Sequence, residues 1–194
     1  MKKMNEQEKN TYQNVINEAL QLLNKENLSL IIHGASFPSV SSQNTGIGSP
    51  NSEGSKALIN FIKGIFNSIQ LGPAGKTKAI DSSPYTGTIF SNNTLFIDLY
   101  ELTKEEWCEI LPEKTFDSIV KNNPNAGQNK TAYSYIFNEQ EKALREAYKN
   151  YREKLANISS LNDKEKNILE GIKSNFEVYK EENKEWLEKD AVYE

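Results

Sequence analysis

Two short apolar segments with one amphipathic helix between them set the strongest constraint on how this chain can fold. Residues 28–33, LSLIIH, are almost entirely apolar and predict a buried strand. Apolar residues at helical spacing over residues 57–62 predict a helix, and residues 69–71 predict a second strand. A strand, a crossover helix and a second strand favour a parallel sheet, whose functional loops lie at the carboxyl ends of its strands.

The rest of the chain has a mainly helical pattern. Residues 5–24 predict an amphipathic helix, whereas residues 94–100, TLFIDLY, predict one further strand. Beyond them the chain is charged, with alternating Glu and Lys that predict a solvated face. Asn162 and Glu165 have the spacing of a helix start. Two apolar stripes lie in this region: Ala143, Leu144, Ala147, Tyr148, Tyr151 and Leu155, then Ile168, Leu169, Ile172, Phe176 and Tyr179. We interpret the three tyrosines among them as packing residues.

The candidate strands are too few to close a parallel barrel. A helical pattern also continues over residues 185–193 without a stop signal, so we expect that the chain is cut short. We predict three parts: an amino-terminal helix (1–27), a first βαβ part (28–102) and a helical subdomain (103–194).

Composition excludes several classes of protein. The net charge of −4 and the absence of a basic cluster argue against binding to nucleic acid. The amino terminus lacks the apolar core of a signal peptide and no apolar run is long enough to cross a membrane, so we expect a cytoplasmic protein. Cys108 and His33 are the single residues of their types, which leaves no ligand set for zinc and no cysteine–histidine pair for nucleophilic catalysis. We expect both to be structural and predict no metal site.

The segment after the second predicted strand resembles a phosphate-binding loop only superficially. Gly75, Lys76 and Thr77 match the end of such a motif, but Gln70 stands where its first glycine belongs. Pro73 also removes an amide donor, and residues 81–84 predict a turn where a phosphate loop needs a helix. Residues 72–75 are therefore interpreted as a turn that ends the strand.

Five motifs occur in a characteristic order: HGASFPS (33–39), TGIGSPNSEG (45–54), LGPAG (71–75), SSPYTGTIF (82–90) and NNTLFIDL (92–99). In this order they resemble the amino-terminal third of the 4-α-glucanotransferases, also called amylomaltases or disproportionating enzymes, of glycoside hydrolase family 77. Residues 176–194 are similar to the segment just before that family's third strand. The resemblance implies an α/β fold: the amino-terminal portion of a (β/α)8 barrel with two or three parallel strands, incomplete in this chain, followed by an inserted, mainly helical subdomain.

The same resemblance implies contact with α-1,4-glucans or maltooligosaccharides. Tyr85 can stack on the apolar face of a sugar ring, and Ser83, Asp81 and Asn93 can hydrogen-bond to its hydroxyl groups. A Ser-Pro-Tyr turn is also a common structural turn, and Asp81 and Asn93 are equally suited to capping a turn. No metal or organic cofactor is implied.

The catalytic carboxylates are expected outside this sequence. Retaining glycoside chemistry needs two carboxylates close together across the scissile bond. The family's nucleophile and acid/base come from later strands, so we interpret Asp98 as structural and assign no catalytic residue here. Two functions stay open: part of a retaining 4-α-glucanotransferase, or a truncated, non-catalytic relative that binds glucan or a protein. Exposed strand edges would favour self-association or a partner chain that completes the barrel.

Overall fold

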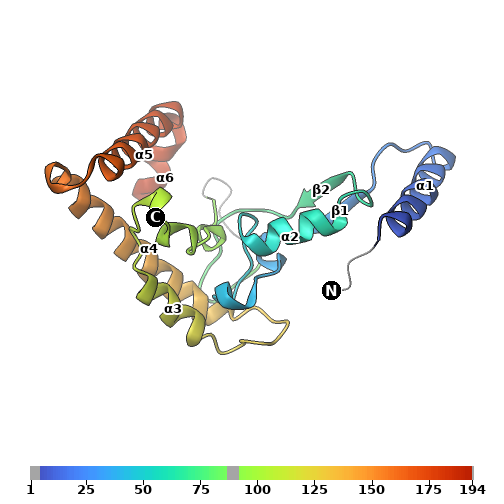
Figure 1. Ribbon diagram of the computed structural model, residues 1–194, viewed down its shortest axis with the longest axis horizontal. Coiled ribbons are helices and arrows are strands. Elements are labelled where there is room, and N and C mark those ends of the chain that lie inside the picture. Colours follow the sequence, from blue (N-terminus) through green and yellow to red (C-terminus); the bar gives the residue numbers. More distant parts are fainter. Residues whose placement is uncertain (1–4, 87–91, 194) are drawn as a thin grey trace.

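The computed structural model describes residues 5–86 and 92–193. Within these ranges the chain is α/β, with a small parallel sheet and a mainly helical second half (Figure 1). Its elements are α1 (Glu6–Leu22), β1 (Ser29–Ile32), α2 (Glu53–Ile62), β2 (Ser68–Leu71), α3 (Glu113–Lys121), α4 (Tyr133–Ala156), α5 (Asp163–Glu182) and α6 (Lys184–Tyr193). Short 3-10 turns occur at Gly34–Ser36, Ser41–Gln43, Thr94–Phe96, Glu101–Thr103, Glu105–Trp107 and Ile158–Ser160.

The predicted strand, helix and strand are present. Strands β1 and β2 pair in parallel, with Ser29 opposite Ser68 and Ile32 opposite Leu71. Helix α2 crosses between them and begins at Ser52, whose side-chain oxygen accepts the Ser55 amide hydrogen. Both strands therefore end on the same side, and the loops that follow them begin there.

The prediction that residues 28–33 form a buried strand is wrong. The side chains of β1 alternate between exposed and half-buried, and Ile31 is 72% exposed. Leu71 at the end of β2 is 52% exposed. An apolar strand is fully buried only when elements cover both faces of its sheet. Among the described residues, nothing covers the side of the sheet on which Ile31 lies.

The main hydrophobic core lies in the helical half. It is built on the inner faces of α3, α4 and α5, and Leu111, Ile136 and Leu169 are 0% exposed within it. Ile47 and Leu95, from the loops that follow the strands, belong to the same cluster. The strand half and the helical half are therefore joined by a shared core.

Not all tyrosines of the two apolar stripes pack against the core. Tyr151 contacts the core, as predicted. Tyr148 and Tyr179 are 57% and 44% exposed, so the packing interpretation is wrong for these two. Tyr148 lies at the margin of its apolar stripe, where a ring can turn toward solvent while its neighbours pack. Tyr179 lies near the carboxyl end of α5, where Phe176 of the same stripe is also 50% exposed.

Asn162 starts a helix, as its spacing with Glu165 predicted. Its side-chain oxygen accepts the Glu165 amide hydrogen at 2.9 Å and begins α5. The Glu165 carboxylate bonds to the Asn162 side-chain amide. A full capping box forms instead at Asn5 and Glu8, at the start of α1.

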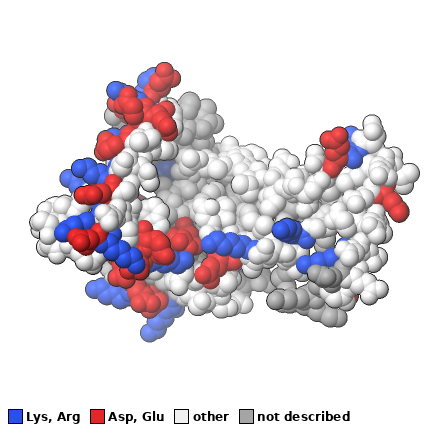
Figure 2. Space-filling model, turned by 45° about the horizontal axis from the view of Figure 1, so that its top comes forward, with Lys and Arg blue, Asp and Glu red and all other residues white. Residues whose placement is uncertain are grey.

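Charged side chains gather over the helical half. Figure 2 shows acidic and basic residues interleaved there, and few of either kind over the strand half. Several are paired along α4, such as Arg145 with Glu141 and Lys142 with Glu139. Exposed pairs of this kind add little stability, so this face is a solvated surface, as the sequence predicted.

Residues 94–100 do not form the predicted strand. Thr94–Phe96 is a 3-10 turn. The Asn93 side-chain oxygen caps its start by accepting the Leu95 amide hydrogen. Leu95 and Leu99 are both buried, which is a spacing of four rather than the spacing of two that a strand needs. The carbonyl groups of Thr94 and Ile97 accept hydrogen bonds from the Gln140 side chain, which takes the place of a partner strand.

Asp98, in this segment, is partly buried. Its Oδ1 accepts the Tyr100 amide hydrogen at 3.1 Å, whereas its Oδ2 is buried and has no partner among the described residues. Burial, which disfavours the charged form, raises the pKa of the Asp98 carboxyl above its ordinary value. The folded state then binds the proton more tightly than the unfolded state, so stability falls as the pH rises from the unfolded pKa through the folded one.

Replacing this carboxylate should therefore remove a pH-dependent destabilisation. We expect Asp98→Asn to be more stable than the unmodified chain at pH 7 and to lose that advantage toward pH 4. Urea unfolding at both values checks this, with the exposed α3 substitution Asp117→Asn as a control. An advantage that stays constant with pH would contradict the prediction.

Candidate functional site

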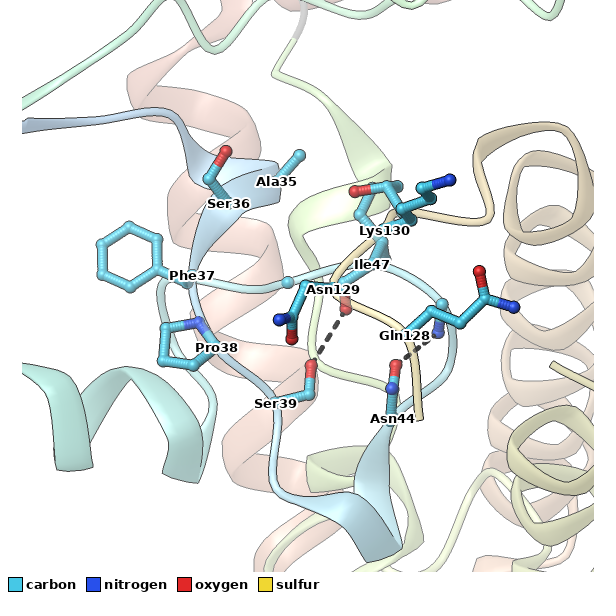
Figure 3. A pocket seen from close by; sticks show the side chains of 13 residues that line it. Ala35, Ser36, Phe37, Pro38, Ser39, Asn44, Ile47, Gln128, Asn129 and Lys130 are labelled. Atoms are coloured by element: carbon cyan, nitrogen blue, oxygen red, sulfur yellow. Dashed lines mark hydrogen bonds between the residues drawn. The ribbon is translucent and has the colours of Figure 1, made fainter. Parts of the chain in front are cut away.

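Two adjoining cavities lie where the loops that follow β1 and β2 meet the start of α4. The first, here called the strand-end cavity, has a volume of about 210 Å³ and is lined by His33, Thr77, Ser82, Pro84, Asn93, Phe96 and Tyr133, among others. The second, the loop cavity, has a volume of about 420 Å³ and lies between residues 35–48 and 128–131 (Figure 3). Ala35, Ile47 and Thr131 line both cavities, so the two share a wall.

His33 directly follows β1 and forms part of the strand-end cavity. Its Nδ1 accepts the Ala35 amide hydrogen at 3.3 Å, and its ring lies edge-on to Phe96 with centroids 5.7 Å apart. Its Nε2 is buried and has no hydrogen-bond partner within the described part of the chain. A Cβ at Gly72 would lie 2.9 Å from this ring, so glycine there lets the end of β2 approach it.

The loop after β1 is folded tightly on itself. A Cβ at Gly48 would lie 2.0 Å from the Phe37 carbonyl oxygen, and one at Gly54 would lie 1.9 Å from that of Pro38. Gly46 has a φ of +103°, a backbone angle that residues with a side chain rarely adopt. These glycines are therefore required by close backbone packing, which fixes the wall shared by both cavities.

Asp81 and Ser83 form the turn that presents Tyr85. The two carboxylate oxygens of Asp81 accept the Ser83 amide hydrogen at 2.9 Å and the Thr86 hydroxyl hydrogen at 2.7 Å. These hydrogen bonds lower the pKa of the Asp81 carboxyl, and the bond from Thr86 has a larger effect than the bond from Ser83. The Tyr85 ring is 82% exposed beyond this turn. The end of the Ser-Pro-Tyr motif, residues 87–90, lies outside the described residues.

Asn93 lies deeper, in a chain of side-chain hydrogen bonds that reaches α4. Its amide donates to the Thr77 hydroxyl at 3.1 Å, and Tyr133 contacts both Thr77 Oγ1 at 2.8 Å and the Lys78 carbonyl at 2.7 Å. A carbonyl can only accept, so the single phenolic proton goes to Lys78 and the Thr77 hydroxyl donates to Tyr133. This chain holds the loop after β2 against the helical half.

The four predicted binding residues thus occupy different positions. Asp81, Ser83 and Tyr85 share one turn, whose Ser82 and Pro84 line the strand-end cavity. Asn93 is buried and also lines that cavity. Asp81 and Asn93 both cap turns, which is the structural role that their residue types also suggested. Sequence reasoning missed Thr77 and Tyr133, because neither lies in a motif that indicates contact.

The chemistry available in the cavities is that of neutral polar groups and one cationic side chain, Lys130 of the loop cavity. As the described residues define them, neither cavity is lined by an Asp or Glu side chain. Within residues 5–86 and 92–193, no three His, Cys, Asp or Glu side chains form a group that could hold a metal ion. These residues include no helix that is long and apolar enough to cross a membrane. Such cavities can bind and orient a polar ligand but offer no acid/base pair.

Removing the Tyr133 hydroxyl should loosen the loop after β2. We expect Tyr133→Phe to lower stability by about 1 kcal/mol, the net value of a hydrogen bond, and to speed amide hydrogen exchange over residues 76–86. Hydrogen-exchange mass spectrometry checks this. Tyr135→Phe is the matched control, because it also removes a hydroxyl of α4 that donates to a backbone carbonyl, that of Ile119. Equal exchange over residues 76–86 in the two variants would argue against the role of Tyr133.

Comparison with known proteins identifies the family. The family model for glycoside hydrolase family 77, described as 4-alpha-glucanotransferase, matches residues 35–194. No curated protein and no solved structure matches the chain. The matched range includes all four predicted binding residues and every described cavity-lining residue named above except His33. The match extends over most of the sequence and confirms the resemblance drawn from the motifs: this chain belongs to the 4-α-glucanotransferase family, glycoside hydrolase family 77.

Proposed function

We propose that this chain forms the glucan-binding, amino-terminal part of a retaining 4-α-glucanotransferase. The observation that carries the proposal is the Tyr85 ring, held out from a hydrogen-bonded turn at the carboxyl ends of β1 and β2. An exposed aromatic face beside a polar cavity is suited to a sugar ring, which has an apolar C–H face and hydroxyl groups at its edge. The family match supports glucans as the substrate class.

Each predicted residue has a role in the proposal. Tyr85 stacks on a glucosyl ring, and Ser83 donates its hydroxyl proton to a sugar oxygen, since its Oγ already accepts the Tyr85 amide hydrogen. Asp81 accepts from a sugar hydroxyl with the carboxylate lone pairs that its turn leaves free. Asn93 holds the wall of the strand-end cavity and meets the ligand from inside.

The reaction itself belongs to the whole enzyme. In the proposed mechanism one carboxylate attacks the anomeric carbon and forms a glucosyl ester, while a second, protonated carboxyl group gives its proton to the leaving 4-oxygen of the α-1,4 bond. The second group then takes the proton of the 4-hydroxyl of another glucan as that hydroxyl displaces the first carboxylate. We assign those carboxylates to later strands of a (β/α)8 barrel, of which β1 and β2 are the first two. The residues described here bind and orient the glucan in the cytoplasm, without a cofactor.

A second function is favoured by one observation: no carboxylate lines either cavity in the described part of the chain. A protein with these walls alone would bind glucan without cleaving it. The face of the sheet on which the exposed Ile31 lies would then offer a surface to a partner chain. The two functions differ in whether catalytic carboxylates join the site.

Truncating Tyr85 should weaken glucan binding. We expect Tyr85→Ala to cost about 1 to 2 kcal/mol of binding free energy for maltotriose, because the ring contributes apolar contact area. Calorimetric titration checks this, with Tyr12→Ala on α1 as a control, since Tyr12 is also exposed but lies on another element. Unchanged affinity in Tyr85→Ala would return this residue to a structural role.

The 194-residue chain should bind glucan without transferring it. We expect no formation of longer and shorter oligosaccharides from maltotriose, because transfer needs a pair of carboxylates across the bond. Chromatography of the products after long incubation checks this. Disproportionation by the purified chain would show that it holds a catalytic pair of its own.

A further inference from the structure

A third cavity, here called the inner cavity, lies between the loop after β1 and the segment after residue 92. Its volume of about 10 Å³ is the space of one water-sized group. Its polar lining consists of the side chains of Ser39, Gln43, Thr45, Ser49, Ser52 and Asp98. Ile47 lines this cavity and also the loop cavity and the strand-end cavity, so the inner cavity adjoins the wall that those two share.

Three side chains of the inner cavity carry an oxygen that has no hydrogen-bond partner among the described residues. Asp98 Oδ2 and Gln43 Oε1 are both buried. The third is the hydroxyl of Thr45, a residue that is only 8% exposed. The Gln43 Nε2–H donates to the Glu53 carboxylate at 3.1 Å, which fixes the orientation of the amide and leaves its oxygen unpaired. Buried oxygens without partners are costly, so three of them around one cavity indicate a ligand.

The serine hydroxyls of the inner cavity have lone pairs to offer but no protons. Each donates its one proton to a backbone carbonyl: Ser49 to Phe96 at 2.7 Å, Ser52 to Ser49 at 2.9 Å, and Ser39 to Ile47 at 3.3 Å (Figure 3). A hydroxyl whose proton is already donated can only accept. The lining therefore consists almost entirely of acceptor oxygens.

The surroundings of the inner cavity are negatively charged. Burial raises the pKa of the Asp98 carboxyl, and the nearby Glu101 and Glu53 carboxylates raise it further. Lys104 acts in the opposite direction, but its ammonium group is paired with Glu101 at 2.7 Å. A positive charge bound beside Asp98 would offset both the burial and the neighbouring carboxylates.

A metal cation satisfies this lining better than a water molecule does. Water donates only two protons, whereas a cation is bound by every surrounding oxygen at once. Calcium–oxygen distances of about 2.3–2.6 Å are shorter than the roughly 2.8 Å of a hydrogen bond between oxygens, so the space is large enough. Mg²⁺ needs near-octahedral geometry at about 2.0–2.1 Å, which a cavity of this size suits less well.

We propose that the inner cavity is a calcium site, in which Asp98, Gln43 and Thr45 supply oxygen ligands. It consists of one carboxylate among neutral oxygens, and not of a cluster of His, Cys, Asp or Glu, of which the described residues hold none. The ion clamps the loop after β1 to the segment after residue 92 and so stabilises the wall behind both larger cavities. This role involves no glucan and does not rest on the proposed function.

Thermal unfolding of the full 194-residue chain, in chelator and in added calcium, tests the site. A single carboxylate predicts weak binding, with a Kd of about 1 mM. Mass action at about 10 mM Ca²⁺ should then raise Tm by about 4 °C. Asp98→Asn and Thr45→Val should lose most of this increase. The matched control is Asp117→Asn, which removes an exposed carboxylate of α3 and should keep it. In chelator Asp98→Asn is expected to be the more stable chain, so a smaller increase there does not reflect misfolding.

The variants and salts separate a specific site from general effects. An increase in the unmodified chain and in Asp117→Asn that Asp98→Asn lacks supports the inference, and this comparison decides the test if Thr45→Val does not fold. An equal increase in all the chains would place the ion on surface carboxylates and overturn it. An increase that sodium chloride of the same ionic strength reproduces would be screening, and no increase in the unmodified chain would leave the cavity to water. Either result would also overturn the inference.

Discussion

The side-chain amide of Gln140 fastens the segment after residue 92 to α4. It is 1% exposed on α4 and donates to the carbonyl groups of Thr94 and Ile97, which no strand partner satisfies. Burying an unpaired carbonyl is costly, so these two bonds determine where the segment after residue 92 can lie. That placement brings Asn93 against Thr77, and through Tyr133 it sets the position of the loop after β2.

The candidate site depends on this junction more than on the sheet. Strands β1 and β2 determine where two loops begin, but four residue pairs of sheet cannot hold long loops in place. The loops are held by contacts with the helical half: Ala132 with Gly46, Asn123 with Asn44, and Tyr133 with Lys78. A mainly helical segment thus forms one wall of both cavities and determines their shape.

The sequence was enough to predict the elements that depend on local pattern. The paired strands, the crossover helix and the stripe through Tyr151 follow from apolar spacing, and the family followed from the order of short motifs. The segment at residues 94–100 could not be assigned in the same way, because its apolar run fits a strand until Gln140 supplies the hydrogen bonds of a turn. The loop cavity could not be predicted either, because residues 128–131 carry no motif and form a cavity wall only together with residues 35–48.

Local chemistry was enough to suggest the turn at Asp81, because an Asp two residues before a free amide favours an Asx turn in almost any context. The need for glycine at Gly48 and Gly54 comes from the folded loop, where a Cβ would meet the carbonyl oxygens of Phe37 and Pro38. Which side chains share a cavity was decided by long-range packing. Asn93, Thr77 and Tyr133 meet because buried polar groups must find partners, and the partners available to them come from distant parts of the folded chain.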